Sequence, residues 1–307
     1  MGKIDTYELA RPPRSVPLTI FIKLLFGGSL NIVAWIIFGF SMIFYWGLVM
    51  NADLTSLIYP SGSFRTARGQ IMAIRDTSFS EGGSESHSGT PIVAYHFRFS
   101  GPDGKAHEGV SYSLGGHVPH MAENPSEGNE VTVLFQERNP AVSRIEGLRH
   151  RPFTWPVVFV ALFPSLGLGL VTFGFLSGLK ANRLMVGGFP ALGALVSNEP
   201  TNMTVNNRPV YALTFEFEAR NGRKYRVNEK TNEPEKLEDD PSERLLYDGE
   251  NPSYAVMFDS LPGSPAIDAR GNFVDRSPLG ALAVLIAPGI TIAGHGLYAL
   301  HACFHLF

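Results

Sequence analysis

The chain has 307 residues, a formal net charge of −3 and 17% charged residues, against about 25% in an average soluble domain. Neither segment between its apolar stretches is basic, since residues 51–152 carry nine Lys or Arg against eleven Asp or Glu, and residues 179–277 carry twelve against fifteen. This balance argues against a nucleic-acid partner, and the single cysteine excludes an intramolecular disulfide and a cysteine-based zinc site.

Three apolar stretches, residues 30–49, 156–177 and 279–300, contain no Asp, Glu, Lys or Arg. A helix of about twenty residues rises about 30 Å, enough to cross a hydrocarbon core, so we predict three transmembrane helices. Residues 1–29 are expected to form a cytoplasmic or surface segment, in which Gly27-Gly28 separates a surface helix over residues 17–26 from the first span. The first stretch is too long and too aromatic for a signal peptide, which favours an uncleaved anchor.

The segment between the first two spans is predicted to form a β-domain over residues 60–150. Residues 68–74 and 93–99 alternate as strands, residues 78–89 form a mobile loop, and Asp103-Gly104 closes a hairpin whose second strand covers residues 105–114. A further strand, residues 130–135, ends at Asn139-Pro140. The predicted core residues are Val93, Tyr95, Phe97, Phe99, Val131, Val133 and Phe135.

The segment between the last two spans, residues 184–276, repeats this order and predicts a second β-domain. The strand that begins at Gly69 matches Gly193 at an offset of 124 residues, Asp103-Gly104 matches Asn221-Gly222 at 118, and Asn139-Pro140 matches Asn251-Pro252 at 112. The three matches occur in the same order in both segments, and the loops between them do not match. This pattern favours a duplication over two unrelated β-meanders. The predicted core residues are Tyr211, Leu213, Phe215, Phe217, Tyr247, Val256 and Phe258. The expected fold is membrane α+β, with three transmembrane helices and two small antiparallel β-domains of about five strands, each a sheet or half-open barrel.

These residues resemble a bacterial membrane-protein family known as domain of unknown function 3592, apparently in two copies. The matching motifs are Gly69-Gln70-Ile71, Tyr95-His96-Phe97, Asp103-Gly104 and the strand over residues 128–135 that leads to Asn139-Pro140. The chain departs from the family at Gln136-Glu137 and Asp248-Gly249, where the family has Asp-Pro. The resemblance implies a fold and a bacterial inner membrane, and it carries no catalytic residue.

Three single crossings would place the two β-domains on opposite faces of the membrane. Alternatively, Pro164, Gly167 and Gly169 could break the second stretch into a re-entrant turn. Lys and Arg near the spans number seven on the N-terminal side and six on the other, which favours a cytoplasmic N-terminus by one residue. We expect a multi-pass protein of the inner membrane.

Weak metal-ligand candidates are His117 with His120, three residues apart, and His301 with His305, four residues apart. Pro119 marks the first pair as a loop, so surface histidines are the simpler interpretation. The second pair shares a helix face, where interfacial anchoring is the simpler interpretation.

Gly174 and Gly178 form a small-residue face suited to helix packing, either within the chain or between subunits. No phosphate loop, nucleophile elbow, zinc-binding or dinucleotide motif is present, so we predict no catalytic residue and no cofactor.

The main functional hypothesis is a non-catalytic membrane protein whose β-domains serve as a protein-binding or assembly module. The predicted partners are the lipid bilayer and another protein or a homo-oligomer, with no nucleic acid. One alternative is a metal- or haem-dependent membrane enzyme that uses His117 and His120, or His301 and His305. Another is a membrane immunity or envelope-stress protein.

Overall fold

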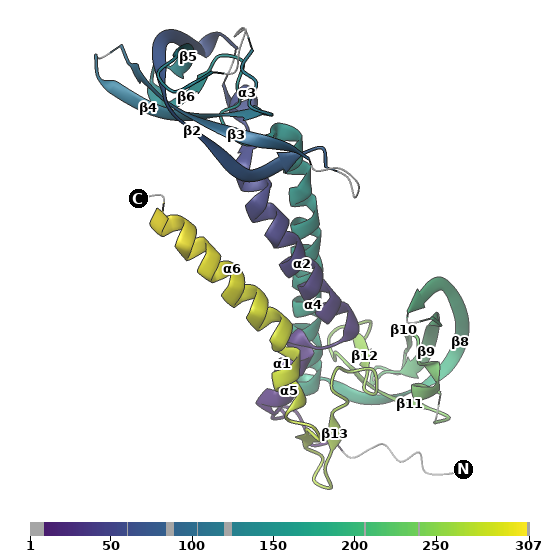
Figure 1. The fold of residues 1–307 in the computed structure, drawn as a ribbon. Helices are drawn as coiled ribbons and strands as arrows, with labels where there is room; N and C mark the ends of the chain where they lie inside the picture. Colours follow the sequence, from purple (N-terminus) through teal and green to yellow (C-terminus); the bar gives the residue numbers. More distant parts are fainter. Residues whose placement is uncertain are drawn as a thin grey trace, which may run out of the picture. The chain divides into compact units, whose positions relative to one another are not determined.

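The computed structural model describes residues 9–59, 61–83, 89–102, 104–119, 125–205, 207–238 and 240–305. The chain divides into two compact units: one comprises residues 1–40 and 163–307, and the other comprises residues 41–162. Each unit contains one five-stranded antiparallel sheet (Figure 1). We call the sheet of residues 64–145 domain 1 and the sheet of residues 189–257 domain 2.

Domain 1 consists of β2 (Phe64–Glu81), β3 (Thr90–Ser100), β4 (Ala106–Leu114), β5 (Glu130–Gln136) and β6 (Asn139–Ile145), in the order β4-β3-β2-β5-β6. The long β2 pairs with β5 through its first half and with β3 through its second half. Because β4 also packs against β6, the sheet curls into a partly open barrel. All seven predicted core residues lie in its buried cluster. The predicted loop over residues 78–89 is wrong at its start, since β2 continues to Glu81, and Asn139 begins a strand that sequence reasoning did not identify.

Short elements join domain 1 to the apolar helices. They are η1 (Val49–Asn51), β1 (Ala52–Asp53), α3 (Thr55–Ile58), η2 (Ser61–Ser63) and β7 (Phe153–Thr154), with β1 parallel to β7. Asp53 fixes this junction, because its carboxylate accepts hydrogen bonds from Thr55 N at 3.0 Å and from His150 N at 2.7 Å. Burial raises the pKa of Asp53, but a hydrogen bond from the Thr55 hydroxyl, the two backbone hydrogen bonds and the charge of Arg144 outweigh burial and leave the pKa below its ordinary value.

Domain 2 consists of β8 (Phe189–Val205), β9 (Arg208–Glu218), β10 (Lys224–Thr231), β11 (Glu243–Tyr247) and β12 (Ala255–Met257), with η4 (Pro234–Lys236) before β11. Its order, β10-β9-β8-β11-β12, is that of domain 1. Of the predicted core residues, Val256 and Phe258 are misplaced. Met257 faces the barrel core instead, while Val256 and Phe258 join a second cluster with α1 and the end of α4. A shift of one residue along a strand exchanges its two faces, which explains the error.

The two sheets match residue by residue. Adding 124 to β2, 118 to β3 and β4, and 112 to β5 gives β8, β9, β10 and β11 to within one residue at each end. Adding 112 to β6 gives residues 251–257, of which β12 forms the last three. Equivalent register pairs include Ile71↔Phe97 with Leu195↔Phe215, Ala73↔His96 with Ser197↔Thr214, and Val133↔Ile145 with Leu245↔Met257. Both register shifts in β2 recur at the equivalent positions of β8. The duplicated β-fold expected from the sequence is therefore present.

The predicted landmarks lie on equivalent connections. Gly104 and Gly222 have φ of +73° and +72°, a conformation that glycine adopts readily, and each closes the hairpin after the second strand of its sheet. Asp103 lies outside the described residues. Asn139 begins β6 directly after the turn that follows β5, and Asn251 lies in the connection between β11 and β12, so both mark the passage between the last two strands of their sheets. The strand order and the long, shared first strand resemble an OB fold, a five-stranded partly open barrel.

The apolar stretches form α2 (Ser29–Gly47), η3 (Trp155–Ala161) followed by α4 (Leu162–Gly187), and α5 (Gly280–Val284) followed by α6 (Ile286–His305). Among the described residues, two helical stretches, 29–51 and 155–187, are long and apolar enough to cross a membrane, each with a mean hydropathy of 2.1. The third predicted stretch does not meet this test, because histidines and glycines dilute its apolar residues. α4 runs unbroken through Pro164, Gly167 and Gly169, so the re-entrant alternative is wrong.

The N-terminal segment differs from a simple surface segment. The predicted break at Gly27-Gly28 separates α1 (Leu18–Phe26) from α2. However, α1 is buried on one face, where Ile20 and Leu24 contact the cluster that contains Phe258 and the short strands β13 (Ala266–Ile267) and β14 (Phe273–Val274). The amphipathic start of the chain is thus part of the packed structure around domain 2.

Candidate functional site

The outward side of the second and third strands is the candidate site in each domain. We call it the hairpin face; it belongs to β3 and β4 in domain 1 and to β9 and β10 in domain 2. Alternation along these strands directs every second side chain away from the core. In OB folds the face of the second and third strands binds ligands, and this fold-level analogy supports the same choice here.

The hairpin face of domain 1 contains a shallow hollow of about 230 Å³. It is lined by Met72, His96, Phe97, Arg98, Glu108, Gly109 and Val110. Met72 occupies the first register shift of β2, which turns its side chain outward and leaves it exposed. The lining therefore combines a flexible thioether, an imidazole and an ion pair.

The ion pair of this hollow joins neighbouring strands. Arg98 Nη2 lies 2.5 Å from Glu108 Oε1, and Arg98 Nε lies 3.0 Å from the same oxygen. The two side chains are 52% and 67% exposed, so the pair adds at most about 1 kcal/mol to stability. Both groups are therefore free to exchange this partner for a ligand at little cost.

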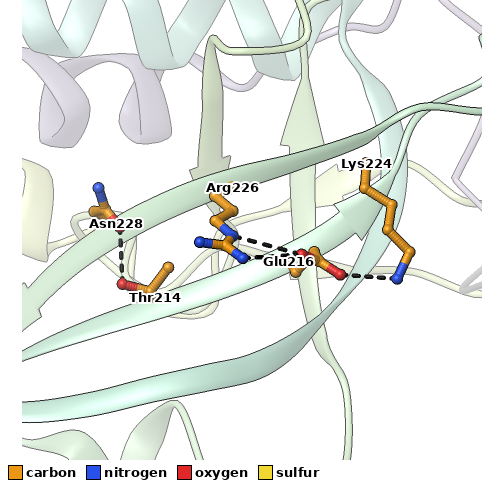
Figure 2. Close-up of polar contacts among 5 residues, drawn as sticks. All are labelled: Thr214, Glu216, Lys224, Arg226 and Asn228. Atoms are coloured by element: carbon orange, nitrogen blue, oxygen red, sulfur yellow. Dashed lines mark hydrogen bonds and ion pairs between the residues drawn. The ribbon is translucent and has the colours of Figure 1, made fainter.

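The hairpin face of domain 2 is a denser polar network (Figure 2). Glu216 accepts a hydrogen bond from Lys224 Nζ at 2.8 Å and contacts the guanidinium of Arg226 at 3.5 Å. Beside it, Thr214 Oγ1 donates to Asn228 Oδ1 at 2.9 Å. The hydrogen bond and charge of Lys224 lower the pKa of Glu216, and the same contact raises the pKa of Lys224.

Equivalent positions of the two faces carry opposite charges. With the offset of 118 residues, Arg98 corresponds to Glu216 and Glu108 corresponds to Arg226. His96 corresponds to Thr214, whose hydroxyl is bonded to Asn228. The strands are therefore arranged alike in the two domains, while the positive and negative charges on the hairpin face exchange places.

The predicted metal candidates are not brought together. His117 is exposed and its carbonyl accepts a hydrogen bond from Ser113 Oγ, while His120 lies outside the described residues. His301 is exposed on α6, and the side chain of His305 lies outside the described part of the chain. The described residues contain no group of three His, Cys, Asp or Glu side chains arranged to hold a metal ion.

The small-residue face of α4 contacts the preceding helices of the same chain. A Cβ at Gly178 would lie 2.2 Å from Leu24 O, and a Cβ at Gly174 would lie 2.8 Å from Asn31 Oδ1. Gly167 approaches the backbone of Phe38 in the same way. Glycine therefore permits close approach between α4 and the helices α1 and α2, as small residues do in lipid.

Sequence reasoning missed two buried cations near the start of the chain. Arg14 donates to Met185 O at 3.0 Å and to Gly188 O at 2.8 Å, which satisfies carbonyls at the C-terminal end of α4. Lys23 Nζ lies 2.6 Å from Asp275 Oδ1, and the side chains are only 5% and 4% exposed. Neither residue is available to a membrane surface, although both were counted for the orientation of the chain.

Sequence reasoning also missed a threonine in each domain whose hydroxyl joins the long first strand of the sheet, β2 or β8, to the next strand; we call this arrangement the threonine latch. Thr77 Oγ1 donates to Ile92 O at 2.6 Å and accepts from the N–H two residues further on at 3.2 Å. Thr201, at the offset of 124 residues, repeats both bonds, with 2.8 Å to Val210 O. Thr77 lies between the predicted strand of residues 68–74 and the predicted loop of residues 78–89, so only the shared offset could have revealed it.

The comparisons with known proteins assign the chain to no family. No family model matches the chain, and no curated protein matches it, so the resemblance to domain of unknown function 3592 stays a prediction. One similar solved structure is titled "Structure and Conformational Change of a Replication Protein A Heterotrimer Bound to ssDNA", with 9% identity and a TM-score of 0.16. The match covers 62% of this chain and 44% of that chain, so this chain spans less than half of its length.

The prediction about partners needs a correction. It excluded nucleic acid, but the matched structure is by its title a complex with single-stranded DNA, so the exclusion does not stand. The exclusion relied on the net charge of whole segments, which does not determine the charge of one face. At a TM-score of 0.16 the likeness carries no argument for a nucleic-acid ligand of this chain.

Proposed function

We propose that the protein is a multi-pass membrane protein whose two β-domains are non-catalytic binding modules that use their hairpin faces. The membrane assignment is supported by α2 and α4, whose most apolar windows are only 17% buried within the protein. Exposed side chains such as Phe40, Leu168 and Phe173 require an apolar solvent around them. A bacterial inner membrane is the setting that the family resemblance implies.

We include α6 as a third helix in the bilayer. Its exposed face carries Ile286, Ile290, Leu297 and Leu300, among others. Its polar side contacts α2, where a Cβ at Gly39 would lie 2.5 Å from Thr291 Oγ1. The imidazole of His295 also has a partner on α2, because its Nε2 lies 2.9 Å from Gly39 O. This hydrogen bond satisfies a polar side chain without water, as the interior of a bilayer demands.

The inverted ion pair is the observation that supports a binding role for the hairpin faces. Strand register, both register shifts and the threonine latch are the same in the two domains, which is what a common fold requires. The pairs Arg98–Glu108 and Arg226–Glu216 are not needed for that fold, because the arginine of each pair is exposed to solvent and such pairs contribute little to stability. Exchanged charges on a constant scaffold are expected when two copies bind different ligands.

Cysteine accessibility tests the membrane arrangement. In a Cys303→Ser background, Ser100→Cys reports on domain 1 and Arg223→Cys on domain 2, since both positions are exposed. If α2 and α4 each cross once, chain connectivity requires an impermeant maleimide to label the two from opposite sides of sealed vesicles. The wild-type Cys303 then reports on α6. Labelling of both introduced cysteines from one side would contradict two crossings.

A face exchange tests the binding role. The variant His96→Thr/Arg98→Glu/Glu108→Arg/Val110→Asn gives domain 1 the Thr214–Asn228 and Glu216–Arg226 pairs of the hairpin face of domain 2. A photoreactive residue in place of Met72 should crosslink a defined partner in wild-type cells, and the exchange should reduce this product at least tenfold. Ser78→Ala, an exposed change outside the face, is the matched control. An unchanged crosslink after the exchange would refute a role for the face.

A further inference from the structure

The second halves of β2 and β8 form equivalent arms, residues 73–81 in domain 1 and residues 197–205 in domain 2. Each arm pairs with only one strand among the described residues, β3 or β9 respectively, while β5 and β11 pair with the first halves. The other edge of each arm therefore presents main-chain groups that take part in no strand pairing with the described residues, and its side chains determine what can lie against it.

The chain itself covers the arm of domain 1. After β6 the segment of residues 149–154 returns to β2, where the rings of Phe153 and Phe79 lie 5.2 Å apart at their centroids. Arg149 donates to both oxygens of Glu81, at 2.6 Å and 3.2 Å. Phe153 is 5% exposed, and Arg149 and Glu81 are each 27% exposed. Two side-chain contacts, an apolar one and an ion pair four residues apart, therefore cover the tip of this arm, while the main chain of the covering segment pairs with Tyr112 of β4 and with β1.

In the part of the chain that the structure describes, no segment covers the arm of domain 2 in this way. The offset of 124 residues places Met203 at the position of Phe79 and Val205 at the position of Glu81. Their side chains are 57% and 38% exposed. Opposite Val205 in the register lies Arg208, whose side chain is 64% exposed. Its guanidinium lies 4.0 Å from Glu233 Oε1, an exposed ion pair that is worth little and that a ligand carboxylate can replace. The tip of this arm is therefore apolar and cationic, whereas the tip of the first arm is apolar and anionic.

The segment that would cover the second arm is used elsewhere. The offset of 112 residues makes Leu261 the equivalent of Arg149, and Leu261 is 4% exposed in the cluster formed with α1. Pro262 contacts the Gly27 position, and Gly263 lies against the side chain of Lys23. In domain 2 the chain after the fifth strand thus stabilises α1 and leaves its own arm open.

We propose that the arm of domain 2 is a docking site for an extended segment of a partner protein that carries an aromatic residue and an acidic residue four positions apart. The contacts of the covering segment in domain 1 are the template for this binding mode. The charge of the binding segment differs, because the arm of domain 2 presents an arginine where the arm of domain 1 presents a glutamate. The aromatic ring packs on Met203, as Phe153 packs on Phe79, and the acidic residue pairs with Arg208 instead of an arginine with Glu81. Main-chain bonds to the free edge of β8 add affinity without sequence preference. This surface is distinct from the hairpin faces, so its failure would leave the function proposed for them intact.

Two synthetic peptides test the proposal on the full-length protein in nanodiscs. One has the sequence of residues 148–154, and the other is the same peptide with the position of Arg149 changed to glutamate. We expect the glutamate peptide to bind at least tenfold more tightly, and Met203→Ser or Arg208→Ser to weaken it at least tenfold. The exposed substitution Arg223→Ser is the matched control.

A reciprocal variant makes the test decisive. Met203→Phe/Val205→Glu/Arg208→Thr converts the second arm to the first type and should reverse the preference toward the arginine peptide. Equal binding of both peptides, or no binding up to millimolar concentration, would overturn the proposal. A photoreactive residue in place of Met203 that reacts with lipid or with another copy of the chain, rather than with the glutamate peptide, would overturn it as well.

Discussion

After its fifth strand the chain returns to the sheet in domain 1, whereas in domain 2 it leaves the sheet and packs against α1. The two anchors differ in burial: Arg149 and Glu81 are each 27% exposed, while Lys23 and Asp275 are 5% and 4% exposed. The same β-fold therefore allows the chain after its fifth strand to be anchored in two different ways. The difference shows that strand register is set by the sheet itself, while the path of the flanking chain is set by what lies beside each domain.

The largest effect is expected at the buried anchor. Asp275→Asn leaves Lys23 buried without its counter-charge and should cost about 3–5 kcal/mol. The equivalent test in domain 1, Glu81→Gln, should cost about 1 kcal/mol or less, because that pair is partly hydrated. Hydrogen exchange of β9 and β3 in the purified protein measures the two domains separately. Equal costs would contradict the assigned difference between the anchors.

The buried anchor also predicts a dependence on pH. Burial raises the pKa of Asp275, but the hydrogen bonds from Lys23 and Ser277 N outweigh it and leave the pKa below its ordinary value. Stability from this group is therefore complete above the unfolded pKa of about 3.9 and is lost as the pH falls through the lower folded-state pKa. Asp275→Asn should remove that acid transition from domain 2 and leave domain 1 unchanged.

A pair of equivalent glycines sharpens the comparison of the cores. A Cβ at Gly69 would lie 2.6 Å from Val133 and 3.0 Å from the carbonyl of Arg98, whereas at Gly193 the closest atom, at 2.9 Å, is a terminal methyl of Leu245. Gly69→Ala should therefore cost about 1–3 kcal/mol, and Gly193→Ala clearly less, because a methyl can move and a backbone carbonyl cannot. Thermal unfolding of the two variants, followed by domain-specific hydrogen exchange, measures this; a larger cost at Gly193 would count against it.

The threonine latch should behave alike in both domains. Thr77→Val and Thr201→Val each remove a hydroxyl that donates to one carbonyl and accepts from one N–H. We expect each to cost about 1 kcal/mol and to increase exchange in the arm of its own domain only. Thr66→Val, at an exposed position of β2, is the control. A loss in one domain and none in the other would show that the latch is not a shared element.

The smallest effect concerns a carboxyl that only domain 2 contains. Burial raises the pKa of Glu229, against an opposing hydrogen bond with Ser260, and the equivalent residue of domain 1 is the fully buried Ser111. A carboxyl with a raised pKa contributes stability below its unfolded pKa of about 4.3, and this is lost as the pH rises through the folded-state pKa. Glu229→Gln should therefore stabilise domain 2 at neutral pH and flatten its pH dependence. Unfolding between pH 4 and 8 measures this, and an unchanged slope would contradict it.

Much of the fold could be predicted because its signals are local. Alternating residues such as Tyr95, Phe97 and Phe215 identify strand faces, glycines at 104 and 222 identify hairpins, and the constant offsets identify the repeat. The errors occurred where a local signal is ambiguous. The polar stretch after residue 78 resembles a loop although β2 continues to Glu81, and the short β12 gives too few residues to determine its inward face.

The candidate site was harder to predict than the fold. Histidine is a common metal ligand, so histidines are natural candidates in the sequence, but the structure places His117 and His301 on the surface. The residues that form the hairpin faces, such as Arg98 and Glu216, have no distinguishing signal in the sequence. Only their register across neighbouring strands shows that the two pairs are equivalent and inverted.

The sequence by itself determined the apolar helices, the strand faces, the hairpin turns and the duplication, because each depends on residues close together or on a constant offset. The tertiary structure alone decided which buried charges meet and which surfaces stay open. Lys23 and Asp275 are separated by 252 positions, and no periodicity relates them. The same holds for the chain after the fifth strand, whose path depends on whether α1 or the arm of its own sheet offers the better burial.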